Sequence, residues 1–138
     1  MNKVLGITLI VLALAIAILP SFADCASQGN VLTLASGKEI PMKCHWTAKA
    51  EIAVGIPLLA AGAMMVTTRR KSNLLILGIM GCVLGVVAIM LTTNSLIGVC
   101  TTPTMVCRTL MKPTLTILGS LAIAASVGII VLSRKAKD

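Results

Sequence analysis

Four long apolar stretches divide the chain, and polar residues gather between them. The stretches are Val4–Ala23, Ile52–Thr68, Leu74–Leu91 and Thr114–Ser133. A helix rises about 1.5 Å per residue, so about 20 residues cross a hydrocarbon core of about 30 Å. Because backbone groups left unpaired in lipid are intolerable, each stretch is predicted to be a transmembrane helix. Snorkelling basic flanks lengthen the shorter stretches. The predicted spans are then 4–23, 50–68, 72–91 and 113–133, and the predicted loops are 24–49 and 92–112.

Composition supports one all-α membrane domain over residues 1–138. Hydrophobic residues make up 57% of the chain and charged residues 12%, and the mean hydropathy is +1.03. The chain has 12 Lys and Arg against 4 Asp and Glu, but one Phe, one Trp and no Tyr give it no aromatic platform for nucleic acid. We therefore expect a lipid bilayer as the partner of the spans, no nucleic acid, and a multi-pass protein of the cell membrane.

The basic residues also predict the orientation of the spans. Lys and Arg in short loops stay on the cytoplasmic side, and Arg69, Arg70 and Lys71 fill the tight link between the second and third spans. Both termini are therefore expected in the cytoplasm, with loops 24–49 and 92–112 outside. The first span also resembles a signal peptide, but its apolar core is longer than usual, which favours a retained helix.

Side chains suited to catalysis are scarce. The chain has one His and four acids, and it contains no Walker loop, dinucleotide fingerprint or His-Glu-x-x-His pattern. Most hydrolytic and phosphoryl-transfer enzymes are thereby disfavoured, and we do not expect an enzyme of those classes.

Glycines lie on one face of the third span. They are Gly78, Gly81 and Gly85, at spacings of three and four residues. Because glycine has no side chain, this face lets another helix approach closely. The face could receive another membrane subunit, or it could pack inside a four-helix bundle. Short loops that hold neighbouring spans together favour internal packing.

The two predicted outer loops end in similar segments. Residues 42–49 read Met-Lys-Cys-His-Trp-Thr-Ala-Lys, and residues 105–112 read Met-Val-Cys-Arg-Thr-Leu-Met-Lys. Both fit Met-x-Cys-(His or Arg)-x-x-x-Lys, and each precedes the returning helix of a hairpin. The pattern predicts two similar helical hairpins related by a pseudo-twofold axis along the membrane normal.

Each predicted outer loop holds two cysteines, Cys25 with Cys44 and Cys100 with Cys107. Disulfides persist outside the cytoplasm, and four cysteines allow three connectivities. The repeat favours one bridge within each loop, and each loop closure would stabilise the protein by about 2–4 kcal/mol.

The segments Met42–Glu51 and Cys100–Cys107 resemble a little-characterised family of small four-span membrane proteins of bacteria and archaea. The shared motifs are Met-Lys-Cys-His-Trp-Thr-Ala-x-Ala-Glu and Cys-x-x-Pro-Thr-Met-x-Cys. Members are often encoded beside permease and ATPase subunits of ABC transporters. The resemblance implies a non-catalytic accessory or substrate-handling subunit, with permease and ATPase chains as partners.

Two other functions fit the same residues. A cysteine pair in each outer loop is similar to the arrangement of four-span thiol-disulfide oxidoreductases, and Cys44 and Cys107 have cationic neighbours that would favour thiolates. Alternatively, Met42, Cys44, His45, Met105 and Cys107 could converge to bind haem or copper, because soft sulfur and imidazole ligands suit these metals.

Glu51 lies at the outer edge of the second span, where an unpaired acid is costly. An ion pair with Lys49, Arg108 or Lys112 would relieve this cost, and a contact with a ligand or partner helix is the alternative. The expected contact surface therefore consists of His45, Trp46, Glu51, Arg108 and Lys112.

Overall fold

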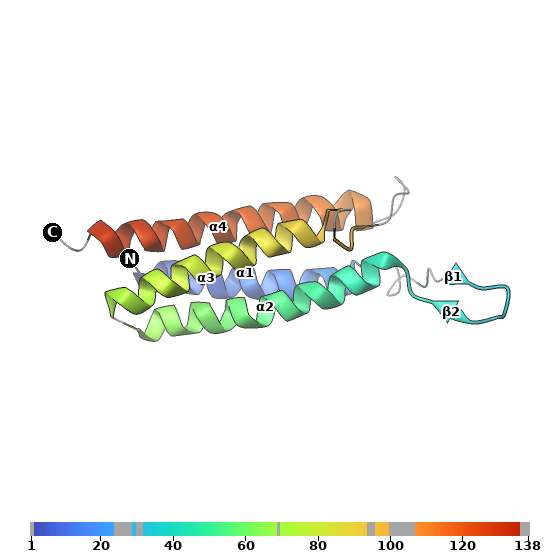
Figure 1. Ribbon diagram of the computed structural model, residues 1–138, viewed down its shortest axis with the longest axis horizontal. Helices are drawn as coiled ribbons and strands as arrows, with labels where there is room; N and C mark the ends of the chain where they lie inside the picture. Colours follow the sequence, from blue (N-terminus) through green and yellow to red (C-terminus); the bar gives the residue numbers. More distant parts are fainter. Residues whose placement is uncertain are drawn as a thin grey trace.

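Each apolar stretch folds as one long helix, because a helix satisfies every backbone group within the segment. The computed structural model describes residues 2–23, 29, 32–68, 70–93, 96–99 and 107–135. Four helices form a bundle (Figure 1): α1 (Asn2–Phe22), α2 (Lys43–Thr67), α3 (Lys71–Leu91) and α4 (Lys112–Lys135). A hairpin of β1 (Leu32–Thr33) and β2 (Glu39–Ile40) precedes α2, and a π-helical turn η1 (Cys107–Met111) runs into α4. The predicted four-helix architecture is confirmed, since all four helices are long and apolar enough to cross a membrane.

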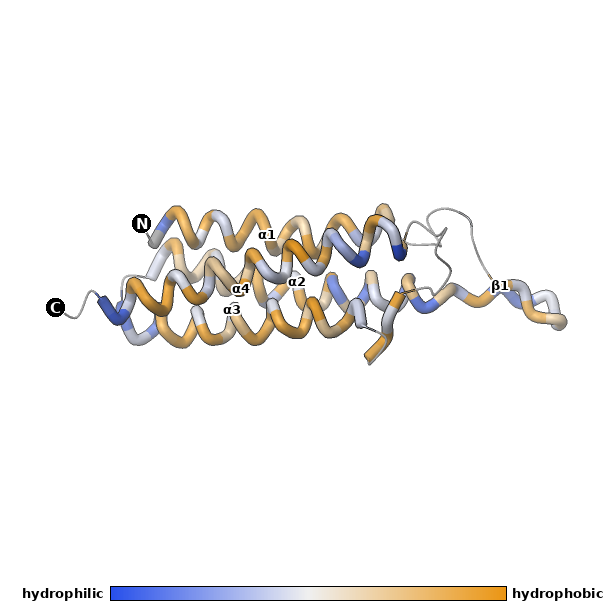
Figure 2. Tube along the Cα trace, turned by 90° about the horizontal axis from the view of Figure 1, so that it is seen from above, coloured by the Kyte–Doolittle hydropathy of each residue, from blue (hydrophilic) through white to orange (hydrophobic). Residues whose placement is uncertain are grey.

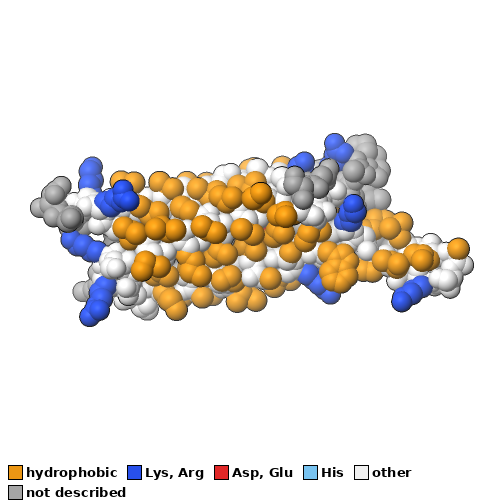
Figure 3. Space-filling model, in the orientation of Figure 1, with side chains coloured by type: hydrophobic (Ala, Val, Ile, Leu, Met, Phe, Trp, Pro, Cys, Tyr) orange, Lys and Arg blue, Asp and Glu red, His pale blue; other side chains and the backbone are white. Residues whose placement is uncertain are grey.

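The two ends of the bundle differ. Both chain termini lie at one end, and the β1–β2 hairpin projects beyond the other, which we call the loop end (Figure 1). Apolar residues dominate the helices between the ends (Figure 2), and Lys and Arg side chains gather near both ends on the face seen in Figure 3. This distribution suits a protein that crosses a bilayer. That the loop end faces outward stays a prediction from the positions of the basic residues.

Two helices begin earlier than their hydropathy indicates. Within the predicted loop 24–49, α2 already begins at Lys43. The predicted loop 92–112 likewise ends in the helical residues Cys107–Lys112. Polar residues are tolerated in these first turns because their side chains can reach the headgroup region, so the apolar stretch is shorter than the helix.

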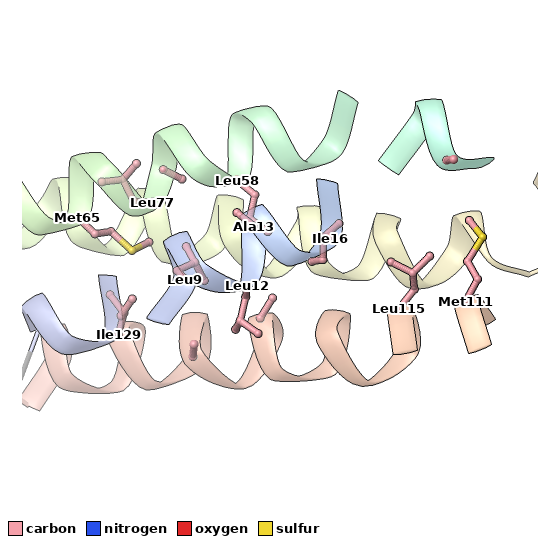
Figure 4. Packing of buried hydrophobic residues seen from close by; sticks show 14 of the residues in the cluster. Leu9, Leu12, Ala13, Ile16, Leu58, Met65, Leu77, Met111, Leu115 and Ile129 are labelled. Carbon is pink, nitrogen blue, oxygen red and sulfur yellow. The ribbon is translucent and has the colours of Figure 1, made fainter. Parts of the chain in front are cut away.

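The core runs along the axis of the bundle. Leu9 and Ile16 of α1, Leu58 of α2 and Ile129 of α4 are each 1% exposed or less, and Figure 4 shows side chains from all the long helices meeting between them. The glycine face of α3 packs inside this bundle. A Cβ atom at Gly78 would lie 3.3 Å from the carbonyl oxygen of Ser126 on α4. The glycines therefore serve internal packing, the interpretation that the short loops favour.

The contacts within the first hairpin recur in the second. A Cβ atom at Gly6 would lie 3.3 Å from the carbonyl oxygen of Gly62, and one at Gly78 would lie 3.3 Å from that of Ser126. Gly78 follows Gly6 by 72 positions, and Ser126 follows Gly62 by 64. Residues separated by these intervals are thus equivalent in the two hairpins.

A second pair of contacts gives the same intervals. A Cβ atom at Gly55 would lie 3.2 Å from the carbonyl oxygen of Ala13, and one at Gly119 would lie 3.2 Å from that of Gly85. Gly85 again follows Ala13 by 72 positions, and Gly119 follows Gly55 by 64. Because two independent contacts agree, the two hairpins are similar in structure as well as in motif.

The π-helical turn explains one discrepancy between motif and structure. The motif cysteines Cys44 and Cys107 are 63 positions apart, whereas the packed residues farther along α2 and α4 are 64 apart. Such a turn accommodates one additional residue within a helix. η1 begins at the motif cysteine Cys107 and precedes the packed part of α4. The second hairpin therefore gains its additional residue in η1.

Candidate functional site

The loop end carries exposed cationic and aromatic side chains on the first turns of α2, on η1 and at the start of α4. Lys43, Lys49, Arg108 and Lys112 are exposed, and the Trp46 side chain is 54% exposed. The ammonium group of Lys49 lies 5.4 Å from the centre of the Trp46 ring. This arrangement gives the start of α2 a cation–π pair, and a tryptophan near the end of a transmembrane span is typical of an interfacial anchor.

His45 contacts the same tryptophan. The ring centres of His45 and Trp46 are 6.2 Å apart and their planes are inclined by 76°, an edge-to-face arrangement. His45 is half-buried, whereas its motif equivalent Arg108 is exposed. The predicted contact residues therefore lie at the same end of the bundle, His45 and Trp46 on α2, Arg108 on η1 and Lys112 on α4.

The motif cysteines begin the second helix of each hairpin and point into the bundle. Cys44 is 0% exposed and Cys107 is 1% exposed, and the sulfur of Cys107 lies 3.3 Å from the carbonyl oxygen of Ala23. Cys25 and Cys100, the predicted disulfide partners, lie outside the described residues, so the pairing stays a prediction. Buried sulfurs differ from the exposed, electropositive thiols typical of redox sites.

Only part of the predicted haem or copper site lies among the described residues. Met42 packs partly buried against the core, and Met105 lies outside the described residues. Within the part of the chain that the structure describes, no three His, Cys, Asp or Glu side chains come together as a metal site. Because the predicted ligands include two methionines, haem or copper binding stays a prediction.

Glu51 is not part of the outer surface, which corrects the sequence-based expectation. Its side chain is 0% exposed. Both carboxylate oxygens are buried and have no hydrogen-bond partner among the described residues. The expected partners Lys49, Arg108 and Lys112 are exposed instead. Lys49 cannot pair with Glu51 because residues two apart on a helix do not face each other.

A short segment after α3 is bonded to both α2 and α3. We call residues Leu96–Val99 the strap. The Thr47 hydroxyl donates a hydrogen bond of 2.7 Å to the carbonyl oxygen of Gly98, and the Gly98 amide donates one of 3.2 Å to Leu91. Gly98 has a φ of 77°, a conformation that favours glycine. Thr47, one helical turn before Glu51, is also 0% exposed.

An apolar cleft of about 340 Å³ lies at the loop end between α1 and the start of α4. Its lining is mainly apolar and suits lipid acyl chains better than a soluble ligand. Its lining residues are Leu19, Pro20, Phe22, Ala23, Leu110, Met111, Thr114 and Leu115.

The β1–β2 hairpin has one mainly apolar face, which Lys38 shares two positions before Ile40, and one polar face. Sequence reasoning missed this hairpin. Leu32 pairs with Ile40, and Thr33 pairs with Glu39. Leu34 follows Leu32 by two positions and so lies on the same face, because side chains alternate along a strand. Leu32, Leu34 and Ile40 are 55%, 48% and 39% exposed. The alternation over residues 32–34 is a signal for this hairpin, but it is too short to be specific.

A family model described as a domain of unknown function, DUF4418, matches residues 4–132 of the chain. None of the curated proteins compared with the chain matches it, nor does any of the solved structures.

Proposed function

Because the chain belongs to the DUF4418 family, whose function is unknown, we propose a role for it from its geometry. It acts as a non-catalytic membrane subunit of an ABC-type transport complex and contacts the larger permease at its loop end. The apolar face of the β1–β2 hairpin carries this proposal. Leu32, Leu34 and Ile40 are exposed on an element that projects beyond the bundle (Figure 1).

An isolated two-stranded hairpin is marginally stable in water, and an exposed apolar face on it favours a binding partner. The hairpin folds back through a turn that two backbone hydrogen bonds hold. The Leu34 amide donates to the carbonyl oxygen of Lys38 at 3.0 Å, and the Gly37 amide donates to that of Leu34 at 2.9 Å. These bonds hold the backbone, but they do not cover the apolar side chains. Covering them against a partner would supply the missing burial.

Charge at the loop end favours an acidic partner surface or an anionic solute. The exposed Lys43, Lys49, Arg108 and Lys112 come from both hairpins. The described acids there are Glu39, on the polar face of the hairpin, and the buried Glu51. A basic surface next to an apolar hairpin suits a subunit that delivers or recognises a solute at the entrance of a permease.

Replacing Leu32 and Ile40 together by Ser is expected to abolish co-purification of permease and ATPase chains in mild detergent. The pair contributes two directly opposed apolar side chains, so its loss removes the centre of the proposed contact. Mass spectrometry of the wild-type and variant samples measures the effect.

The matched control replaces Thr33 by Ser and Glu39 by Gln on the opposite face, and it should retain both partner chains. If the wild-type protein purifies without any permease or ATPase, the proposal fails. An absorption spectrum of the same sample would reveal haem, and metal analysis would reveal copper.

We also propose that Cys25 pairs with Cys44 and Cys100 with Cys107. In support, Cys44 and Cys107 occupy equivalent positions at the starts of α2 and η1. Peptide mapping without reductant of protein from its native membrane should find these two linkages. Four thiols that alkylate without reduction would contradict the pairing.

A further inference from the structure

Glu51 occupies a position at which the fold does not require an acid. Its equivalent in the second hairpin, 64 positions later, is Leu115. Leu115 is 1% exposed and Glu51 is 0% exposed, so both side chains point into the bundle. One hairpin thus fills this place with an apolar side chain, and the other fills it with a carboxyl group that has no hydrogen-bond partner among the described residues.

Among the residues that the structure describes, no charged side chain donates a hydrogen bond to Glu51. On α2, Lys43 and Lys49 are exposed. α1 carries no titratable side chain from Val4 to Phe22, and α3 carries only Lys71, at the opposite end of the helix, and Cys82, more than two turns before its end.

The other described titratable groups at this end of the bundle belong to η1 and α4. Cys107 is buried, and Arg108 and Lys112 are exposed. An uncompensated charge within a membrane bundle is far costlier than a neutral acid, so a protonated carboxyl group fits this place better than a carboxylate.

The strap is bonded to α2 one helical turn before Glu51. Thr47 and Glu51 are four positions apart and lie on the same face of α2, and the Thr47 hydroxyl holds the strap by its 2.7 Å bond to Gly98. Val99 of the strap is 5% exposed and belongs to the main core. Ile97 packs against a smaller cluster of Val54, Ala88 and Leu91. The strap therefore closes the α2–α3 seam next to the acid.

We propose that Glu51 is a reversible proton-binding site that the strap Leu96–Val99 closes off from the outer aqueous phase. The ligand is a proton, which exchanges with water when the strap opens. The proposal does not rest on the transport function, because it concerns the carboxyl group and its cover within this chain alone.

Carbodiimides test the protonation state, because they add to protonated carboxyl groups. The full chain in lipid nanodiscs is treated with the lipid-soluble dicyclohexylcarbodiimide, and the modified residue is mapped by peptide mass spectrometry. We expect modification of Glu51 that declines when the pH is raised and returns when it is lowered. No adduct at Glu51 at any pH at which the protein stays folded would overturn the proposal.

Infrared spectroscopy gives an independent measure of the proton. The wild-type spectrum minus that of Glu51→Gln should contain a protonated-carboxyl band that disappears reversibly on alkalinisation. Glu39→Gln, which removes an exposed acid of β2, is the matched control and should leave that band in place. A difference spectrum with carboxylate bands only, at every pH, would contradict a bound proton.

A water-soluble carbodiimide tests the strap. In the wild type it should modify the exposed Glu39 much faster than Glu51. Thr47→Val removes the hydrogen bond to Gly98 but retains the side-chain shape, and it should speed modification of Glu51 about fivefold, which corresponds to about 1 kcal/mol. Thr67→Val, which removes an exposed hydroxyl at the far end of α2, is the control. Equal rates at Glu51 in the wild type and Thr47→Val would show that the strap does not close the site.

Discussion

The Glu51→Leu variant is expected to be more stable than the wild type by about 1–3 kcal/mol, because it replaces a buried polar group that has no partner with an apolar one. The equivalent Leu115 shows that the fold accommodates leucine at this place. Thermal unfolding in detergent, followed by circular dichroism, measures the difference.

The reciprocal change, Leu115→Glu, is the control. It introduces an acid at the equivalent position of the second hairpin. It should cost about 3 kcal/mol or more, because it removes a packed leucine and buries a second acid. A loss of stability in Glu51→Leu would mean that the acid has a structural partner, and the interpretation of Glu51 as a functional group would then be wrong.

Gly119→Ala is expected to destabilise the second hairpin by about 1–3 kcal/mol through overpacking. The added Cβ would lie 2.7 Å from a side-chain carbon of Ile89 and 3.2 Å from the carbonyl oxygen of Gly85. The backbone oxygen cannot move aside without shifting α3 relative to α4. Thermal unfolding under the same conditions measures the loss.

Gly128→Ala provides a control within the same helix. Its nearest neighbours would be side-chain carbons of Leu5 at 3.8 and 3.9 Å, which is ordinary van der Waals contact. Since alanine favours a helix over glycine by about 1 kcal/mol, this variant should be as stable as the wild type or more so. Equal losses in the two variants would contradict the close packing of α3 on α4.

The sequence predicts the four helices well because lipid leaves the backbone few alternatives. The helix starts were harder to predict, since hydropathy detects the apolar stretch but not the polar turns that precede it. The residues from Lys43 to Lys49 are helical, although their hydropathy predicts a loop. The difference also concerns Glu51, because Lys49 can reach it in a loop, whereas on a helix the two side chains face different ways.

The candidate site was only partly predictable. The repeat of Met42–Lys49 in Met105–Lys112 correctly indicated two similar hairpins, because equivalent segments begin equivalent helices. The strap depends on a long-range bond between Thr47 and Gly98 and on a φ of 77° at Gly98. Contacts between residues so far apart in the chain leave no local pattern, and the extra residue in η1 shifts the register by one position.

Photo-cross-linking at the β1–β2 hairpin tests the central proposal most directly. A photoreactive residue replaces Leu34 on the apolar face or, as the control, Thr33 on the polar face, and intact native cells are irradiated. We predict a cross-link from position 34 to the permease subunit of an ABC-type transporter, and much less from position 33. Cross-links from position 34 to lipid alone, or equal capture from both faces, would contradict a partner at the loop end.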